Sequence, residues 1–355
     1  MLLAYFEPYE PAADTNQTKA MRKQWWAILF VFAAFAHAYA DAAFLMEEPY
    51  GTFGKYNPTG HAAVYLTQIC ADSPTQLRPC QPGEAGVVIS RYHKIAGYDW
   101  LAIPLLPYLY AVESITAIPQ NIDVHEVAAL RDAYRRAHLL ELAPDNPDGS
   151  APEGEWTQLI GSAYDRRIYG FQIETTPEQD AAFIAEFNHR RNKSQFNIFW
   201  KNCADFSGSV LNFYEPHAVH RNFLADAGIM TPKQVARSFV RYARHHPAEE
   251  LSSFQVPQVP GSVRRSKPAK GVAESLLKSK KYLIPLAFLN PEVTGTIAVI
   301  YFAEGRFNPK RDAGIFDIAR AMQPQTSRAA ARVPDSGPAA QTIPASELKI
   351  ALPPN

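Results

Sequence analysis

The sequence has no excess of charge of either sign. Its 355 residues include 35 Lys and Arg and 35 Asp and Glu, so the formal net charge is zero. Domains that bind nucleic acid usually carry a basic surface, because they must neutralise phosphates. The charge balance gives no support to a nucleic-acid partner, and none is expected.

Metal-ligand patterns are also lacking. His217 and His220 have the spacing of a ligand pair, but no acidic or thiol residue lies beside them at a spacing typical of metal sites. A loop near a helix end explains this pair better. We therefore expect no metal and no cofactor.

The first fifty residues carry the pattern of an export signal. Arg22 and Lys23 form a short basic start, residues 25–36 are almost all apolar, and residues 38–40 read Ala-Tyr-Ala, the small-x-small form of a signal-peptidase site. Charge, apolar run and cleavage site in this order are typical of a secretory signal peptide. We therefore interpret residues 1–40 as a signal peptide.

A polar stretch before Met21 is unusual for such a signal, so we expect Met21 to be the true start and residues 1–20 to be a mis-called extension. The alternative is an uncleaved N-terminal membrane anchor over residues 25–45, which is just long enough to span a bilayer. In both interpretations the remainder of the chain is exported, as a periplasmic or envelope-associated protein.

Export changes the interpretation of the three cysteines. Cys70 and Cys80 lie ten positions apart in a Pro-rich connection, and an oxidising compartment favours a disulfide between them. Cys203 is then unpaired. An unpaired thiol in an exported protein is either a small buried hydrophobe or a group kept free for chemistry.

Hydrophobic periodicity and turn residues predict both strands and helices. The predicted strands are 61–66, 86–93 and 169–175, and the predicted helices are 124–142, 176–191, 202 onward and 231–246. The predicted organisation is a catalytic domain at 41–246, a linker at 247–270, an apolar or helical segment at 271–322 and a disordered tail at 323–355.

The segment 283–303 is apolar overall but contains Pro285, Pro291 and Glu292. Two prolines and a charge make it a poor spanning helix. A buried hairpin, or a segment dipping into the membrane interface, is the preferred interpretation, with a membrane span as the alternative.

The stretch around Cys203 points to chemistry. Asn202 is a good N-cap, so Cys203 falls in the first turn of the following helix. Unpaired N–H groups and the positive end of the helix dipole stabilise a thiolate there. The same N–H groups, at Asn202 and Ala204, are expected to receive an oxyanion.

A thiol nucleophile needs a base, and His61 is the preferred one because it begins a strand directly after a Gly-containing turn. His93, at the end of the partnering strand, or Tyr92 is expected to orient the His61 ring. Ser90 is a further candidate for the residue that orients the His61 ring.

These residues resemble the circularly permuted papain-like proteins, the NlpC-type and lecithin:retinol acyltransferase-like enzymes. Residues 60–66 (Gly-His-Ala-Ala-Val-Tyr-Leu) are similar to their histidine strand, and residues 202–206 (Asn-Cys-Ala-Asp-Phe) to the start of their cysteine helix. Residues 164–203 also look like the Lnb-type N-terminal periplasmic domain. The resemblance covers residues 50–245 and implies a thiol hydrolase or acyltransferase.

A basic stripe on the 231–246 helix has two interpretations. Lys233, Arg237, Arg241 and Arg244 recur at helical spacing, which usually marks a solvated face. In an enzyme at a membrane the stripe is instead a candidate site for anionic headgroups or anionic cell-wall polymer.

Together these observations predict an α+β domain of permuted papain-like form, with a small antiparallel sheet packed on helices and the nucleophile at a helix N-terminus. The expected substrate is envelope lipid, lipoprotein or muropeptide, with peripheral membrane contact. The alternative is a binding or scaffolding domain in which Cys203 is a buried structural residue. The sequence does not distinguish hydrolase from transferase or define an oligomeric state.

Overall fold

The computed structural model describes residues 40–51, 58–247, 250–311 and 313–323. The predicted signal peptide, except Ala40, and the predicted tail, except Gln323, lie outside the described residues. Residues 25–39 of the alternative anchor lie outside the described residues as well. Its last five residues, 41–45, are buried in the first strand of the sheet, between two other strands.

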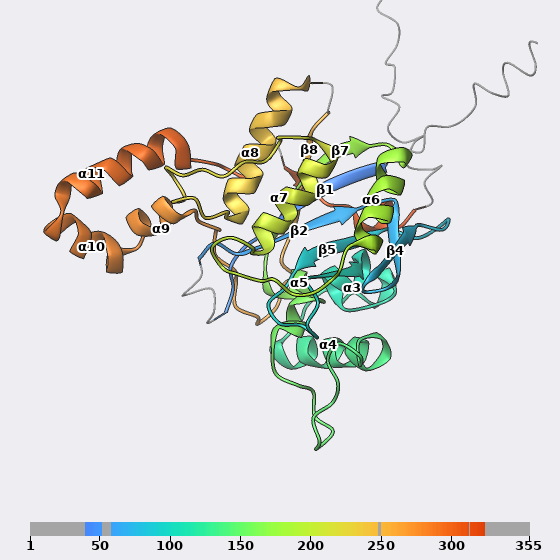
Figure 1. The fold of residues 1–355 in the computed structure, drawn as a ribbon. Coiled ribbons are helices and arrows are strands. Elements are labelled where there is room, and N and C mark those ends of the chain that lie inside the picture. The colour runs from blue at the N-terminus through green and yellow to red at the C-terminus, as the bar shows by residue number, and fades with distance from the viewer. Residues whose placement is uncertain (1–39, 52–57, 248–249, 312, 324–355) are drawn as a thin grey trace, which may run out of the picture. The chain divides into compact units, whose positions relative to one another are not determined.

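A seven-stranded sheet organises the described part of the chain, in the order β6-β5-β2-β1-β7-β8-β9 (Figure 1). Its strands are β1 (Ala40–Glu47), β2 (His61–Leu66), β5 (Val87–Arg91), β6 (Trp100–Pro104), β7 (Ile168–Thr175), β8 (Ser252–Val256) and β9 (Gly314–Ile315). Neighbouring strands are antiparallel except for the parallel pair β8 and β9. A second, two-stranded sheet contains β3 (Ile69–Ser73) and β4 (Gln76–Pro79).

Helices cover both faces of the large sheet (Figure 1). One face packs against α6 (Pro177–His189), α7 (Cys203–Tyr214) and α8 (Pro232–His245); the other packs against α3 (Leu105–Tyr110), α4 (Val124–His138) and α5 (Ser162–Asp165). Successive side chains of a strand point to opposite faces, so Phe44 belongs to the first core and Leu45 to the second. The mixed α+β class predicted from the sequence is confirmed, although this sheet is larger than expected.

The predicted helix starts are confirmed where capping residues defined them. Thr176 caps α6 in a capping box with Gln179, and Thr231 caps α8. Helix α4 starts at Val124 as predicted but ends at His138, four residues before the predicted Leu142. Three short helical turns, η1 (Ile115–Ala117), η2 (Glu155–Gln158) and the π-turn η4 (Tyr301–Gly305), complete the connections.

The predicted linker at 247–270 is wrong, because it contains β8, which pairs with β7 inside the large sheet. Phe254 and Val256 are buried in the core on one face. Their alternation over residues 252–256 is a strand signal, which the Pro and Lys content of the flanking residues concealed.

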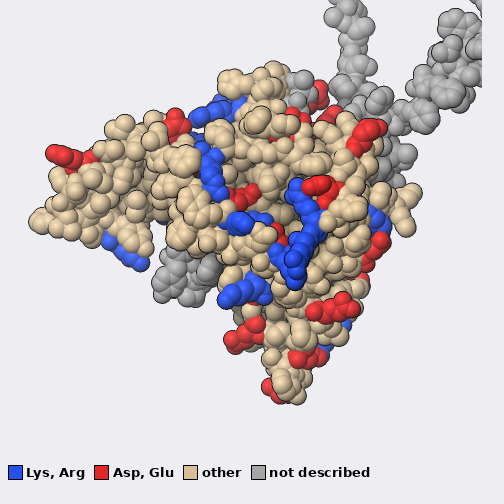
Figure 2. Space-filling model, viewed as in Figure 1, with Lys and Arg blue, Asp and Glu red and all other residues tan. Residues whose placement is uncertain are grey.

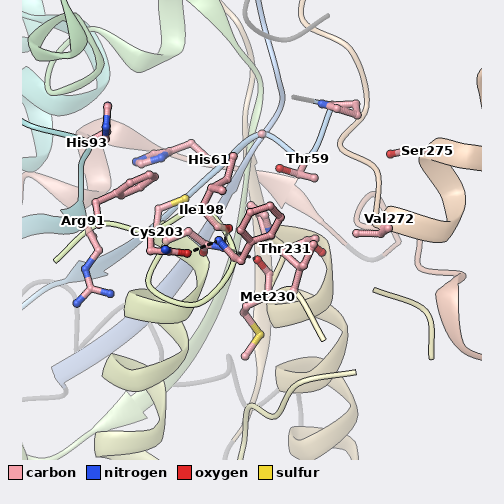
Figure 3. Close-up of a pocket in the computed structure, with 18 of the residues that line it drawn as sticks. Thr59, His61, Arg91, His93, Ile198, Cys203, Met230, Thr231, Val272 and Ser275 are labelled. Atoms are coloured by element: carbon pink, nitrogen blue, oxygen red, sulfur yellow. Dashed lines mark hydrogen bonds between the residues drawn. The ribbon is translucent and has the colours of Figure 1, made fainter. Parts of the chain in front are cut away.

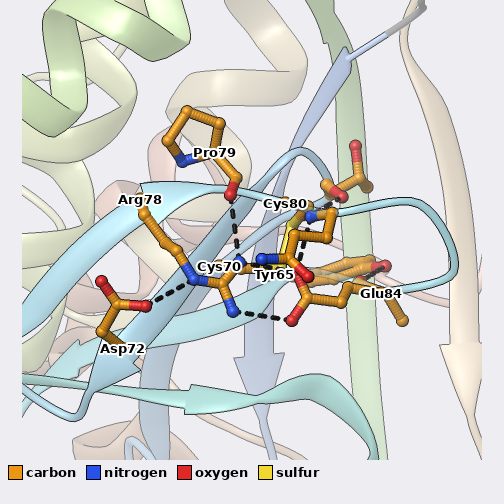
Figure 4. Close-up of a disulfide and its surroundings, with 10 residues drawn as sticks. Tyr65, Cys70, Asp72, Arg78, Pro79, Cys80 and Glu84 are labelled. Atoms are coloured by element: carbon orange, nitrogen blue, oxygen red, sulfur yellow. Dashed lines mark hydrogen bonds and ion pairs between the residues drawn. A yellow bond between two sulfur atoms is a disulfide. The ribbon is translucent and has the colours of Figure 1, made fainter.

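The predicted disulfide between Cys70 and Cys80 is confirmed, with a Cα–Cα distance of 4.8 Å (Figure 4). It joins β3 to the residue that follows β4. Arg78 lies beside it and forms ion pairs with Asp72 and Glu84. The bridge therefore ties the two strands of the small sheet to each other, and β3 lies against β5 and β6.

The described residues after 270 are mostly helical, apart from β9 and short connections. They include α9 (Val272–Lys278), α10 (Lys280–Leu289), α11 (Pro291–Ile300) and the short α12 (Ile318–Ala321). Pro285 lies inside α10, and Asn290 with Pro291 separates α10 from α11. Among the described residues, no helix has both the length and the apolar character needed to cross a membrane.

Candidate functional site

Cys203 is the first residue of α7, and Asn202 is the N-cap, as the sequence predicted. Asn202 Oδ1 accepts hydrogen bonds from the N–H groups of Ala204 (2.8 Å) and Asp205 (3.0 Å). The Asp205 carboxylate in turn accepts from the Asn202 N–H at 3.0 Å. This capping box fixes the direction of the helix start and with it the position of the thiol.

The side-chain amide of Asn202 also joins two loops to the helix start. Its Nδ2 donates to the carbonyls of Ile198 (2.9 Å) and Met230 (3.0 Å). Every polar atom of this buried side chain is thus engaged, and so is the Ala204 N–H. The predicted oxyanion donors are therefore already occupied. In the first turn, the N–H of Cys203 is the one for which the described structure shows no acceptor.

His61 begins β2 after a turn that requires glycine. Gly60 has φ of 84°, and a Cβ there would lie 2.0 Å from the carbonyl oxygen of Glu47. The recorded pairing of β2 with β5 ends at Val64 and Ile89, which leaves the backbone of Ala62 without a strand partner on that side. The Ser90 hydroxyl donates to the Ala62 carbonyl at 2.6 Å.

The thiol of Cys203 lies against the N–H of Ala62, the other backbone group that has no strand partner on that side. Its sulfur accepts a hydrogen bond from the Ala62 N–H. Cys203 is therefore held directly beside Ala62, the residue that follows His61. The side chains of Cys203 and His61 line one cavity (Figure 3). In the described structure no hydrogen bond joins the Cys203 sulfur to the His61 ring.

Ser90 and Tyr92 hold the His61 ring. His61 Nε2 lies 3.2 Å from Ser90 Oγ, and the ring stacks on Tyr92 with a centroid distance of 5.2 Å. Since the single Ser90 proton goes to the Ala62 carbonyl, Ser90 acts as acceptor toward His61. This assigns the Nε2–H tautomer and leaves the Nδ1 lone pair as the basic position.

His93 lies elsewhere in the cavity wall. It is exposed and packs against Phe196, with ring centroids 5.0 Å apart. Among the described contacts none links it to His61. Of the three residues considered for orienting His61, the structure therefore places Ser90 and Tyr92 against its ring, and His93 on another part of the cavity wall.

A buried charged cluster behind His61 was missed by the sequence analysis. Arg166 Nη1 forms an ion pair with Glu47 Oε2 at 2.9 Å, and the Tyr108 hydroxyl donates to Glu47 Oε1. Glu47 lies directly opposite His61 in the β1–β2 register. The sequence did contain a signal for this cluster, because Glu47 ends an apolar strand. Charged residues are seldom fully buried unless they are paired, so a glutamate there indicates a buried cationic partner.

These surroundings favour the neutral forms of the His61 ring and the Cys203 thiol. Burial, together with the positive charge of Arg166, lowers the pKa of His61 to about 3. Burial raises the pKa of Cys203 to about 11, although the N–H groups of Ala62 and Ala204 oppose the rise. The expected thiolate stabilisation at the helix start is thus outweighed by desolvation.

The cavity in front of these residues has a volume of about 710 Å³. In Figure 3, Cys203 and His61 lie on one side of it, and Val272 and Ser275 of α9 lie across from them. Apolar side chains make up most of its walls: Phe196, Ile198, Phe199, Ile229, Met230, Val272, Leu276 and Tyr282. Such a space suits a ligand with an extended apolar part.

The predicted anion-binding stripe is largely neutralised within the protein. Lys233 is buried and pairs with Glu274 of α9 at 2.6 Å. Arg237 is also buried, 4.0 Å from Asp226. Arg241 lies 3.6 Å from Glu304, and Arg244 is exposed. Lys233 and Arg241 therefore fasten the C-terminal segment to α8, Arg237 contacts the loop before that helix, and little of the stripe is a free anion-binding face.

Comparisons of this chain with protein-family models, curated proteins and solved structures find no match. The resemblance to permuted papain-like enzymes therefore depends on the motifs and on the local geometry, and enters below as a proposal.

Proposed function

We propose that this protein is a cysteine-dependent acyl-transfer enzyme of permuted papain-like form, with Cys203 as nucleophile and His61 as base. The observation that carries the proposal is that Cys203 and His61 are both held by contacts around the backbone of Ala62. Ala62 binds the Cys203 sulfur through its N–H, and its carbonyl is held by the Ser90 hydroxyl that also contacts His61. An unpaired thiol in an exported protein then has a base and a cavity beside it.

The reaction begins from the neutral pair. His61 Nδ1 takes the thiol proton as the Cys203 sulfur attacks an ester or amide carbonyl, and the Cys203 N–H donates to the oxyanion. The carbon–oxygen or carbon–nitrogen bond then breaks, and the same proton passes to the departing alcohol or amine. Water, an amine or a hydroxyl resolves the thioester and regenerates the thiol.

The cavity favours an acyl chain over a peptide. Its apolar walls and its volume of about 710 Å³ match the fatty-acyl part of a lipid or lipoprotein. A muropeptide would need a more polar groove, with groups that pair its many amides and carboxylates. We therefore rank envelope lipid or lipoprotein before peptidoglycan as the acyl donor.

One observation favours a second function, binding without catalysis. Burial raises the pKa of Cys203 to about 11, and its sulfur bonds the Ala62 N–H but not His61 in the described structure. An inert thiol at the wall of an apolar cavity fits a domain that binds or scaffolds envelope components.

Intact-protein mass spectrometry distinguishes the two functions. The protein is incubated with phospholipid vesicles, with a diacylated lipopeptide or with muropeptides, and Cys203→Ala is treated in parallel. We expect an added acyl mass on Cys203 with a lipid donor and none on the variant. Equal labelling of the variant, or no adduct from any of the three donors, would contradict the catalytic proposal.

A further inference from the structure

Helices α10 and α11 form a hairpin in which no residue is buried. The stretch 282–303 is nevertheless apolar, with Glu292 as its single charged side chain. Phe288 is 88% exposed and Leu289 is 79% exposed, both at the turn between the helices. Figure 2 shows the surface of this hairpin as almost free of charge. Exposed apolar surface of this extent marks an interaction site.

The distribution of apolar residues favours lipid as the occupant. A helix that packs on a protein partner needs one apolar stripe, whereas these helices are apolar around their circumference. The exposed side chains lie on both helices and in the turn that follows: Tyr282, Ile284, Phe288, Leu289, Val293, Val299 and Phe302. Acyl chains and headgroups surround such a hairpin on several sides at once.

The length of the hairpin limits how deeply it can enter a bilayer. Helices α10 and α11 have 10 residues each, which corresponds to about 15 Å and to half of a hydrocarbon core of about 30 Å. Glu292, in the first turn of α11, makes deep burial of the tip unfavourable. The hairpin therefore fits the interfacial layer, lying along it, and does not cross the bilayer.

Exposed cations surround the base of the hairpin. Lys280 and Lys281 precede its apolar part, and Arg306 and Lys310 follow it. None of the four forms an ion pair with another described residue, whereas the cations of α8 mostly do. Basic groups next to an apolar segment complement the negative surface of an anionic membrane.

The hairpin is continuous with the mouth of the cavity. Leu276 of α9 and Tyr282 of α10 line the cavity together with Ile198 and Phe199. The latter two, with the neighbouring Trp200, are more than half exposed on the loop before α7. Aromatic side chains of this kind are typical of the membrane interface.

We infer that the α10–α11 hairpin lies in the interfacial layer of an anionic bilayer and brings the mouth of the cavity to the lipid surface. The inference does not depend on the proposed thiol chemistry.

A local probe tests the inference in the full chain. Leu289→Cys is labelled with an environment-sensitive fluorophore in a Cys203→Ala background, so that the label has one free thiol. Leu140→Cys is the matched control, because Leu140 is a leucine just after α4 and is 44% exposed. Vesicles contain phosphatidylglycerol and phosphatidylethanolamine, or phosphatidylcholine alone.

We expect anionic vesicles to shift the emission at position 289 to the blue, the shift to weaken with salt, and position 140 to remain unchanged. Binding through another part of the chain would move neither label. Replacing both Phe288 and Leu289 by Ser should weaken vesicle binding by about tenfold or more, unlike Val124→Ser with Leu140→Ser.

Three results would overturn the inference: no lipid response at position 289, equal responses at both positions, or a response at 289 that follows protein concentration without vesicles. The last would show that a second copy of the chain covers the hairpin.

Discussion

Replacing Asn202 by Ala should destabilise the protein by more than the loss of a helix cap. The variant loses the cap on Ala204 and Asp205, which typically contributes about 1 kcal/mol. It also leaves the carbonyls of Ile198 and Met230 without their donors, at about 1 kcal/mol for each hydrogen bond. The sum is about 3 kcal/mol for a side chain that is 8% exposed.

Thr176→Ala is the matched control, because Thr176 caps α6 in the same way but is exposed and accepts one bond, from the Gln179 N–H at 3.2 Å. Its expected cost is about 1 kcal/mol. Asn202→Asp keeps the cap but replaces the donating amide by a carboxylate oxygen that faces the two carbonyls, so a loss of at least about 2 kcal/mol is expected. Urea unfolding followed by circular dichroism measures the three differences. The reasoning fails if Asn202→Ala costs no more than Thr176→Ala.

Three further predictions concern the buried site. Alkylation of Cys203 by iodoacetamide should keep accelerating with pH beyond pH 9, because burial raises its pKa to about 11; a plateau below pH 8 would instead reveal a preformed thiolate. His61 has a folded pKa of about 3, below its ordinary value of 6.5, so its neutral form stabilises the fold above pH 6.5 and this stability is lost as the pH falls toward 3. Between pH 7 and pH 4, His61→Gln should therefore lose about 3 kcal/mol less than the wild type in urea titrations, and identical losses would refute this. Arg166→Met leaves Glu47 unpaired and buried, at a cost of about 3–5 kcal/mol; adding Glu47→Gln should restore part of that stability, and a double variant as unstable as the single one would contradict the pairing.

Local signals in the sequence predicted much of the structure. N-cap residues indicated the starts of α6, α7 and α8, because the side-chain oxygen of an N-cap accepts a hydrogen bond from an N–H group in the first turn of its own helix. The strand His61–Leu66 was predicted with its observed bounds, and the spacing of Cys70 and Cys80 indicated their disulfide. Each of these features depends on neighbours in the chain.

Features that depend on distant contacts were not predictable in the same way. The pair of Glu47 and Arg166 joins residues that are 119 positions apart in the sequence. Strand β8 has a weak pattern of its own and is stabilised by pairing with β7. The stripe on α8 looked like a solvated face because its acidic partners, Asp226 and Glu274, lie outside that helix.

The central claim is that Cys203 and His61 act together as nucleophile and base. Pre-steady-state hydrolysis of a medium-chain p-nitrophenyl ester tests it most directly. The account predicts a burst of one nitrophenolate per wild-type molecule, no burst for Cys203→Ala, and a burst slowed about 10²–10⁴-fold for His61→Gln. A burst that survives in Cys203→Ala, or one that is as fast in His61→Gln as in the wild type, would contradict it.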